Sequence, residues 1–371
     1  MHRDLIKLGE AATYINGYAF KPDDRGKVGL PIIRIQDLTG NSYDLGFYDG
    51  DYPEKIEIND GDVLISWSAS LGVYIWNNGK ALLNQHIFKV VFDKVNIDKN
   101  YFVYAVRYKL DEMGRKTHGA TMKHIVKRDF DATEIPYPSK HEQIEIANNL
   151  KRIENIIELR SNDLQLLDEL IKARFVEMFG DCSNMVLLND LCLIITDGTH
   201  QPPKFQEKGI PFILVSNLSN NTVTYNTEKY ISEETYNELY KRTPIEPGDL
   251  LLSTVGSYGH PAVVTEDIRF LFQRHIAYLR PKRELVNSFY LHSALLAPDG
   301  QRQIEEKVKG IAQKTLNLSE IRKIMIPLPK MEEQDKFAAF VHQVDKSKVV
   351  VQKALDEAQI LFDSLMQKYF G

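Results

Sequence analysis

Cysteine is scarce in this chain, and the two that occur, Cys182 and Cys192, stand at neither a metal-binding nor a thioredoxin-type spacing. They are expected to be plain thiols in a reducing compartment. Long apolar runs are also missing, because none approaches the ~20 residues of a membrane span. The first residues, Met-His-Arg-Asp-Leu, lack the apolar core of a secretory signal. These absences predict a cytoplasmic protein that does not enter a membrane.

A surplus of positive charge is absent as well. The formal net charge is −5, which argues against a protein that coats nucleic acid through bulk electrostatics but leaves room for local basic patches. The apolar and charged fractions, 43% and 26%, are those of an ordinary globular protein. A length of 371 residues allows two or three domains, each with its own core.

Recognisable catalytic motifs are missing too. The Pro202-Pro203 pair is flanked by Gln201 and Lys204, which is not the Asn/Asp-Pro-Pro-aromatic loop of a DNA methyltransferase. Neither a Gly-x-Gly-x-x-Gly nor a Gly-x-x-x-x-Gly-Lys-Ser/Thr loop occurs, and His141 opens no His-Glu-x-x-His. We therefore predict no catalytic and no metal-ligating residue in this chain.

Two weaker candidates for chemistry have simpler interpretations. The charged residues 21–27 superficially resemble a nuclease carboxylate cluster, but no Glu-x-Lys follows on a predicted strand. His86 and His275 stand at matching places in the two halves of the chain. We expect them to be strand-end histidines satisfied by their neighbours rather than ligands or bases.

What is present is an internal repeat. Ile-Pro-Tyr-Pro at residues 135–138 is followed by Gln143, and Ile-Pro-Leu-Pro at residues 326–329 is followed by Gln334, 334 − 143 = 191 residues later. Upstream features recur in the same order: residues 29–38 match 209–218, residues 61–66 match 248–253, and His86-Ile87 matches His275-Ile276. The period is far longer than that of a solenoid, so one module of globular domain plus helix has been duplicated.

Within each half the pattern changes from mixed to purely helical. Residues 5–15 and 187–195 are predicted as short helical starts, and residues 99–113 and 286–296 as helices. Between them, apolar β-branched runs bounded by Gly, Asn and Pro predict strands of a curved, mostly antiparallel sheet. The predicted strands are 32–35, 63–65, 73–76, 87–92, 212–215, 250–252, 262–265 and 276–279.

Beyond each Pro-x-Pro pair, apolar residues step by four and three, as in coiled-coil heptads. The two stripes occupy positions 191 apart. Either each helix lies on its own domain, or the two helices pack on each other; if they do, the second most simply returns antiparallel to the first. The predicted coiled-coil residues are Leu150, Ile153, Ile157, Leu164, Leu167, Ile171, Val341, Val344, Val351, Leu355, Phe362 and Leu365.

The predicted fold class is therefore α+β. Two pseudo-symmetric globular domains, each a mostly antiparallel sheet plus helices, are separated by an antiparallel two-helix coiled coil. The predicted boundaries are residues 1–140 for the first domain, 141–181 for its spacer helix, 182–331 for the second domain and 332–371 for its spacer helix.

Candidate DNA-binding residues gather after matched strands and around matched glycines. Basic residues cluster within 107–128 and again within 302–323, which suits phosphate contacts, although a solvated helix face is the alternative. Base reading needs Arg, Asn, Gln or small hydroxyls in the turns. The candidates are Arg34, Gln36, Ser66, Trp67, Ser68, Ser70, Asn84, Gln85, Arg115, Lys116, Thr121 and Lys123 in the first half, and Asn217, Ser253, Thr254, Ser257, Tyr258, Arg274, Gln313 and Lys314 in the second.

The combined pattern resembles the specificity subunit of type I restriction–modification enzymes. The motifs that carry the resemblance are Leu8-Gly-Glu10, Gly-Leu-Pro-Ile-Ile-Arg with Asp37-Leu38, Gly61-Asp62 with Ser66, Asn84-Gln85, and Pro-x-Pro followed by Glu-Gln at the start of a long helix. Asp197-Gly-Thr-His200 with Pro202 resembles a further phrase of that family and adds Thr199, His200 and Lys204 to the DNA-binding candidates. The first half has Asn16-Gly17-Tyr18 at the corresponding place.

The resemblance implies two target-recognition domains, each reading one half of a bipartite, asymmetric DNA sequence, and helices that set the spacer. The implied partners are double-stranded DNA, two DNA methyltransferase subunits and two restriction (motor–nuclease) subunits. The chain itself would bind no cofactor, while SAM, ATP and Mg would be bound by the partner subunits. The alternatives are the specificity subunit of a type IIB-like restriction–methylation enzyme, an autonomous modifying enzyme, and a coiled-coil structural protein that does not bind DNA.

Overall fold

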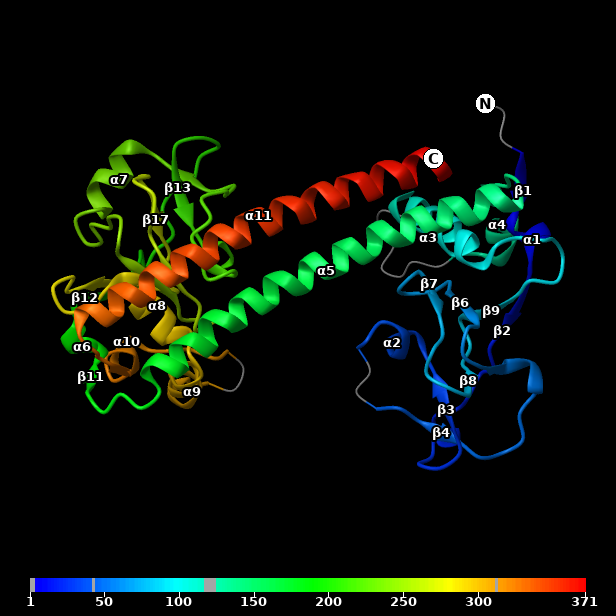
Figure 1. Cartoon of the computed structure of the whole chain (residues 1–371), viewed down its shortest axis with the longest axis horizontal. Helices are drawn as coiled ribbons and strands as arrows, with labels where there is room; N and C mark the ends of the chain where they lie inside the picture. Colours follow the sequence, from blue (N-terminus) through cyan, green and yellow to red (C-terminus); the bar gives the residue numbers. More distant parts are fainter. Residues whose placement is uncertain (1–3, 42–43, 117–124, 311–312) are drawn as a thin grey trace. The chain divides into compact units, whose positions relative to one another are not determined.

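The computed structural model describes residues 4–41, 44–116, 125–310 and 313–371 (Figure 1). The chain divides into two compact units, and each contains one end of either long helix. Unit 1 comprises residues 1–160 and 354–371, and unit 2 comprises residues 161–353. In the part of the chain that the structure describes, no helix is both long and apolar enough to cross a membrane.

Unit 1 contains three small sheets. The first is antiparallel, in the order β2-β9-β6-β7; the second has the order β4-β3-β8-β5 and includes one parallel pair, β3 with β8; the third pairs β1 with β10. The strands are β1 Leu5–Lys7, β2 Thr13–Asn16, β3 Leu30–Ile33, β4 Phe47–Tyr48, β5 Glu57–Ile58, β6 Val63–Ser66, β7 Gly72–Ile75, β8 Ala81–Leu83, β9 Ile87–Val91 and β10 Glu134–Pro136. The helices are α1 Leu8–Ala11, α2 Ile35–Leu38, α3 Lys99–Lys116, α4 Lys127–Asp131 and the first part of α5 Lys140–Phe179, with short 3-10 turns at Pro22–Asp24 and Glu54–Ile56.

Unit 2 repeats this arrangement. Its sheets have the orders β12-β18-β15-β16, β14-β13-β17 and β11-β19, and the pair of β13 with β17 is again parallel. The strands are β11 Met185–Leu187, β12 Cys192–Asp197, β13 Ile210–Ile213, β14 Tyr230–Ile231, β15 Leu250–Ser253, β16 Pro261–Val263, β17 Leu271–Phe272, β18 Ile276–Pro281 and β19 Met325–Pro327. The helices are α6 Leu188–Leu191, α7 Glu233–Leu239, α8 Ser288–Leu296, α9 Pro298–Lys307, α10 Leu318–Ile321 and the first part of α11 Met331–Phe370, with a 3-10 turn at Val215–Leu218.

The α+β fold class is confirmed, with two corrections. In the described residues, each predicted sheet is replaced by three smaller ones, and one of the three contains a parallel pair. The helical starts predicted at residues 5–15 and 187–195 are wrong except for the four residues of α1 and of α6. The flanking residues form strands instead, because β1 and β11 pair with β10 and β19 while β2 and β12 pair with β9 and β18. Ladder pairing with distant strands overrode the local apolar spacing.

The two long helices contact each other with opposite directions in each unit. In unit 1 the ring centroid of Phe370, at the end of α11, lies 5.3 Å from that of Tyr101 on α3, in one core with Leu150 near the start of α5. In unit 2 Phe179, at the end of α5, lies 5.0 Å from Tyr290 on α8. Each core is therefore completed by the end of the helix that belongs to the other repeat.

The predicted coiled-coil residues lie on the less exposed side of each long helix. Leu150, Ile153, Val341 and Val344 are buried, and the other eight are half-buried. A polar contact interrupts the stripe where Lys348 donates to Asp168 at 2.6 Å. Within each unit, the two long helices share one core with the globular part.

The repeated glutamine fixes where each long helix begins. Buried Gln143 accepts a hydrogen bond from the backbone N–H of Asp98 at 2.7 Å and donates to the carbonyl of Pro138 at 2.8 Å. Buried Gln334 accepts from the backbone N–H of Asn287 at 2.9 Å. The glutamine thus joins the first turn of α5 or α11 to the start of α3 or α8, which explains why it stands in both repeats.

Candidate nucleic-acid interface

At the end of β12, the backbone of Asp197-Gly-Thr-His200 in unit 2 passes close to that of residues 272–274 and is hydrogen-bonded to it. This close approach of two backbone segments is called the crossing. The backbone N–H of Thr199 donates to Phe272 at 2.9 Å, and that of Arg274 donates to the carbonyl of Thr199 at 3.0 Å. A Cβ on Gly198 would stand 2.2 Å from the Phe272 carbonyl oxygen, so only glycine permits this approach. The crossing holds Thr199 beside Gln273 in an isolated bridge.

Asp197 holds the side chains of Arg242 and His200 beside this crossing. Its carboxylate accepts from Arg242 at 2.6 Å and from the ring of His200 at 2.8 Å. His200 and Arg242 are about half exposed, while the Asp197 side chain is mostly covered. The carboxylate therefore orients two potential donors without hiding them.

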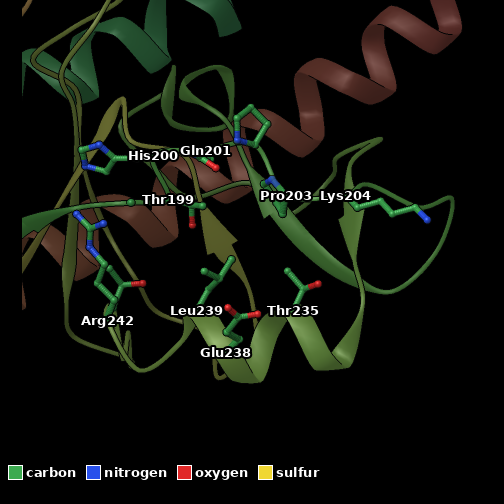
Figure 2. Close-up of a pocket in the computed structure, with 12 residues that line it drawn as sticks. Thr199, His200, Gln201, Pro203, Lys204, Thr235, Glu238, Leu239 and Arg242 are labelled. Atoms are coloured by element: carbon green, nitrogen blue, oxygen red, sulfur yellow. The ribbon is translucent and has the colours of Figure 1, made fainter.

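His200 and Arg242 line a cavity of about 420 Å³ (Figure 2). In Figure 2, Thr199, His200, Gln201, Pro203 and Lys204 lie on the loop that follows β12, opposite residues of α7 and Arg242. The facing residues are Thr235, Glu238, Leu239 and Arg242. The three predicted residues Thr199, His200 and Lys204 are thus brought together. The cavity offers hydroxyl, imidazole and cationic groups, which suit contacts to phosphates or base edges.

A second cavity, of about 260 Å³, lies at the neighbouring tip of unit 2. It gathers Thr254, Arg274 and Gln313, all predicted to bind DNA, together with Asp197 and His275. Backbone hydrogen bonds tie the contributing loops, since Thr254 donates to His275 at 2.9 Å and accepts from Leu316 at 2.8 Å. Burial, and then the charge of Arg274, lowers the pKa of His275, which favours the neutral ring.

Tyr258 and Lys314 share a carboxylate that the sequence did not single out. Both side chains donate to Glu305 on α9, Lys314 at 2.9 Å, and Lys314 also lies 5.7 Å from the Tyr258 ring centroid. Hydrogen bonds from Tyr258 and then Lys314 lower the pKa of Glu305. Glu305 was not predicted, because carboxylates were not among the residue types expected to contact DNA.

Unit 1 contains the same crossing with different side chains. The backbone N–H of Tyr18 donates to the carbonyl of Leu83 at 2.8 Å, and the backbone N–H of Gln85 donates to the carbonyl of Tyr18 at 2.9 Å. Tyr18 and Asn84 form an isolated β-bridge. A Cβ on Gly17 would stand 2.0 Å from the Asn84 carbonyl oxygen. Asn84 and Gln85 therefore hold the places of Gln273 and Arg274.

Trp67 occupies the place of Thr254 in unit 1. Its backbone N–H donates to the carbonyl of His86 at 3.3 Å, and its carbonyl accepts from the backbone N–H of Ile125 at 3.0 Å. Thr254 makes the same two backbone bonds with His275 and Leu316. The indole stacks on Phe88 with ring centroids 5.6 Å apart. An aromatic surface thus stands in unit 1 where unit 2 has a small hydroxyl.

Several predicted DNA-binding residues are used inside the fold. Buried Asn217 accepts from the N–H of Leu214 at 3.0 Å and donates to the carbonyls of Thr224 and Asn226. Buried Ser253 accepts from the N–H of His260 at 2.9 Å, and buried Ser66 donates to a turn carbonyl. Their polar atoms hold turns, so the structure gives them positioning roles.

The remaining predicted residues differ in exposure. Arg34 is tied to Asp37 at 3.2 Å and to a carbonyl of the next loop, Ser68 is buried, and Gln36 is half-buried. Ser70 and Ser257 are exposed on matching turns between β6 and β7 and between β15 and β16. Thr121 and Lys123 lie outside the described residues, as do the side chains of Arg115 and Lys116.

The basic stretch of unit 2 is largely paired within the chain. Arg302 donates to Asp299 and to Glu306, and Lys309 and Lys323 both approach Glu320, at 3.6 and 3.1 Å. The predicted positive patch is thus weakened there. Positive character at the tips of unit 2 comes instead from Lys204, Arg242 and Arg274 around the two cavities.

Comparison with known proteins gives one consistent result. The family model described as type I restriction modification DNA specificity domain matches residues 4–169 and again residues 183–358. The EcoBI specificity subunit of a type I restriction enzyme from Escherichia coli is 28% identical over 408 residues, covering 98% of this chain and 85% of that protein. The MjaVIII specificity subunit from Methanocaldococcus jannaschii is 21% identical over 324 residues, covering 79% of this chain and 74% of that protein.

Solved structures support the fold. The S subunit of a type I restriction-modification system from M. genitalium has a TM-score of 0.57 and 15% identity, covering 100% of this chain and 96% of that chain. A chain from a study of complex assembly and conformational transition of the type I R-M system has a TM-score of 0.60 and 17% identity, covering 99% and 97%. At these identities the likeness shows the architecture alone.

Proposed function

This chain belongs to the family of type I restriction modification DNA specificity domains, and on that premise we propose that its two units each read one half of a bipartite, asymmetric DNA sequence. The observation that carries the proposal is the matched crossing in the two units. The same backbone frame presents Asn84 and Gln85 in unit 1 but Gln273 and Arg274 in unit 2. Arginine pairs best with guanine, and asparagine or glutamine with adenine, so one frame serves two half-sites.

Sequencing of methylated sites tests this proposal directly. Cells carrying only this chain and its methyltransferase partner should show two short recognition boxes separated by a fixed gap. A single continuous recognition sequence would contradict it. Salt-dependent DNA affinity of the reconstituted complex provides the second arm, because a coiled-coil structural protein would show none.

We further propose that α5 and α11 set the gap between the boxes. Each helix has 40 residues, which at ~1.5 Å per residue gives a length of about 60 Å. Phe370 of α11 packs in the core of unit 1 and Phe179 of α5 in that of unit 2, which supports an antiparallel arrangement of the two helices.

Removal of one heptad from the middle of each helix tests the spacer role. Seven residues correspond to about 10 Å, so the gap should shorten by roughly three base pairs at ~3.4 Å each. The control replaces the same heptads with others of equal length that keep the inward residues, and its gap should stay the same. Methylation with an unchanged gap after the deletion would refute the spacer role.

The outer faces of the long helices are the proposed docking sites for two methyltransferase subunits. In unit 1, Leu159 of α5 is 61% exposed and Leu361 of α11 is 50% exposed; in unit 2, Val350 is 68% and Leu170 is 47% exposed. The pairs are equivalent under the repeat, since 350 − 159 = 361 − 170 = 191. Two matching apolar patches suit two copies of one partner, because exposed apolar groups of this kind mark interaction surfaces.

Native mass spectrometry of the assembled complex can count the docked subunits. Leu159→Asp and Val350→Asp should each remove one methyltransferase subunit, and the double variant should remove both. Glu158→Gln, one residue from the first patch on the same exposed turn, is the matched control and should keep both. Retention of both subunits in the double variant would contradict docking on these faces.

The chemistry is assigned to partners. The methyltransferase subunits would bind SAM, and two restriction subunits would bind ATP and Mg and cleave DNA. Incubation of this chain alone with DNA and labelled SAM, or with DNA and Mg, should give no product. Turnover without a partner would overturn the non-catalytic assignment and support an autonomous enzyme.

A further inference from the structure

A cavity of about 250 Å³ in unit 2 lies where α8 meets the two long helices. Its apolar lining includes Ile171 of α5, Val341 of α11 and Leu296 of α8, and its polar lining includes Asp345, Ser293 and His292. The cavity shares no residue with the two cavities of the candidate interface. None of the residues proposed to bind DNA or a methyltransferase subunit lines this cavity.

The repeat shows what fills the corresponding space in unit 1. The bonds of Tyr101 to Pro136 and of Tyr290 to Pro327 place α3 and α8 in register with an offset of 290 − 101 = 189 residues. Ser293 then corresponds to Tyr104. In the long helices the offset is 334 − 143 = 191, so that Asp345 corresponds to Glu154 and Ile171 to Phe362.

Tyr104 occupies that space completely. It is 4% exposed, its hydroxyl donates to Glu154 at 3.0 Å, and its ring centroid lies 6.3 Å from that of Phe362. Arg107 adds a hydrogen bond to Glu154 at 2.8 Å and lies over the Tyr104 ring. One phenol ring thus bridges α3 and both long helices in unit 1.

Unit 2 keeps the carboxylate, as Asp345, but lacks the ring. Ser293 replaces the phenol, and Leu296 replaces Arg107. The cation for the carboxylate now comes from α11 itself, since Lys348 lies 3.3 Å from Asp345. Lys348 is shared with Asp168, and a cavity remains where unit 1 has the phenol of Tyr104.

His292 supplies a fixed polar wall. Its Nε2 lies 3.0 Å from the carbonyl oxygen of Asn221 and 3.1 Å from that of Pro261. Two carbonyl acceptors require that Nε2 carry the proton, and burial lowers the pKa of His292, so that Nδ1 is left as an acceptor in the neutral ring. A carboxylate and a neutral imidazole both accept hydrogen bonds.

We propose that this cavity of unit 2 is a binding site for a small aromatic molecule that carries a hydroxyl or N–H donor. The ring would take the place that Tyr104 holds in unit 1, and the donor would face Asp345 or His292. A bound molecule would contact α5, α8 and α11 together, as Tyr104 contacts their counterparts, and would strengthen the attachment of the long helices to unit 2.

Phenol is the probe, and isothermal titration or ligand-observed NMR on the full chain is the measurement. Saturable binding of one phenol per chain is expected, in the millimolar range for so few atoms, together with a rise in thermal midpoint. Benzene, which lacks the donor, should bind at least tenfold more weakly. Absence of saturable phenol binding would overturn the proposal.

Two variants locate the site, and a third reproduces it. Ser293→Tyr and Leu296→Phe should each abolish phenol binding, because they fill the cavity from two different positions on α8. Tyr104→Ser should open the equivalent space in unit 1 and raise the stoichiometry to two. Unchanged phenol binding in both filled variants would refute the assigned location, and since the two differ in shape, misfolding of one leaves the other to decide.

Discussion

In unit 1 the Tyr101 hydroxyl donates to the carbonyl of Pro136 at 2.8 Å, and in unit 2 Tyr290 makes the same bond to Pro327 at 2.7 Å. A few residues further along the same helix the likeness ends, because Tyr104 is bonded to Glu154 whereas its counterpart Ser293 borders a cavity. The comparison teaches that the repeat preserves the bonds that orient the helices. The two units differ in sequence where a side chain borders a cavity or lies at the surface.

The largest effect is expected from the aromatic ends of the long helices. Phe370→Ala and Phe179→Ala each remove a buried ring, which should cost about 3–5 kcal/mol of unfolding free energy. Hydrogen exchange should show the first variant loosening unit 1 and the second loosening unit 2. Leu361→Ala, an exposed site on the same helix as Phe370, is the control and should change little. Equal loosening of both units by either variant would contradict the pairing of each ring with its core.

The glutamine clamps should differ in strength. Gln334 donates to two carbonyls, of Leu285 and Pro329, whereas Gln143 donates to one, of Pro138. Each buried partner left unpaired costs about 1–3 kcal/mol, so Gln334→Ala should lower the thermal midpoint more than Gln143→Ala. A larger loss in Gln143→Ala would show that the hydrogen-bond count does not decide the strength of the clamp.

Exchange of one tip residue sharpens the functional comparison. Arg274→Gln gives unit 2 the residue that unit 1 has at Gln85, and it should change the methylated sequence in one box only. Loss of a bidentate contact is worth about 1–3 kcal/mol, or roughly five- to 150-fold in discrimination. Lys204→Gln serves as the comparison for a phosphate contact and should weaken methylation without changing the sequence. A change in both boxes would contradict the assignment of one box to each unit.

The smallest effect concerns acid stability at the contact of α3 with α5. Burial raises the pKa of the Glu154 carboxyl, but hydrogen bonds from Arg107 and Lys151 outweigh it, so that the pKa lies below its ordinary value. A carboxyl with a lowered pKa stabilises the fold above the ordinary value, and this contribution is lost as pH falls through the pKa of the folded state.

Glu154→Gln should therefore lower the thermal midpoint at pH 7 and have progressively less effect below about pH 4. The contribution is about 1 kcal/mol or less, since the side chain is partly exposed. The conservative change keeps an acceptor for Tyr104, so a merely steric role would give a difference that does not vary with pH.

Much of the fold was predictable from the repeat, because matched strands and prolines in two copies identify elements that one copy leaves ambiguous. The division of each sheet was not predictable, since the parallel pairs β3 with β8 and β13 with β17 join strands far apart in the sequence. The helix predicted at residues 5–15 was wrong for the same reason. The hydrogen-bond partners of these residues are distant in the sequence, and periodicity reports only local order.

The candidate site divides in the same way. Thr254, Arg274 and Gln313 were predicted from residue type and position, whereas Thr199, His200 and Lys204 were predicted from the family resemblance, and each set lines one cavity. Asn217 carries the same amide group as a base-reading side chain, but its hydrogen bonds hold its own turn. The sequence alone does not distinguish these two uses of an asparagine. Arg242 was missed because it follows α7, where unit 1 has only the short 3-10 turn Glu54–Ile56 and no matching motif.

The ring of Phe370 in the core of unit 1 has a consequence for biosynthesis. Its neighbour Tyr101 stands 370 − 101 = 269 positions earlier. A ribosome adding roughly 5–20 residues per second needs about 10–40 s to travel from residue 160 to residue 370. The unit that emerges first is thus the last to close, and a nascent chain interrupted before α11 is made would leave it unfinished.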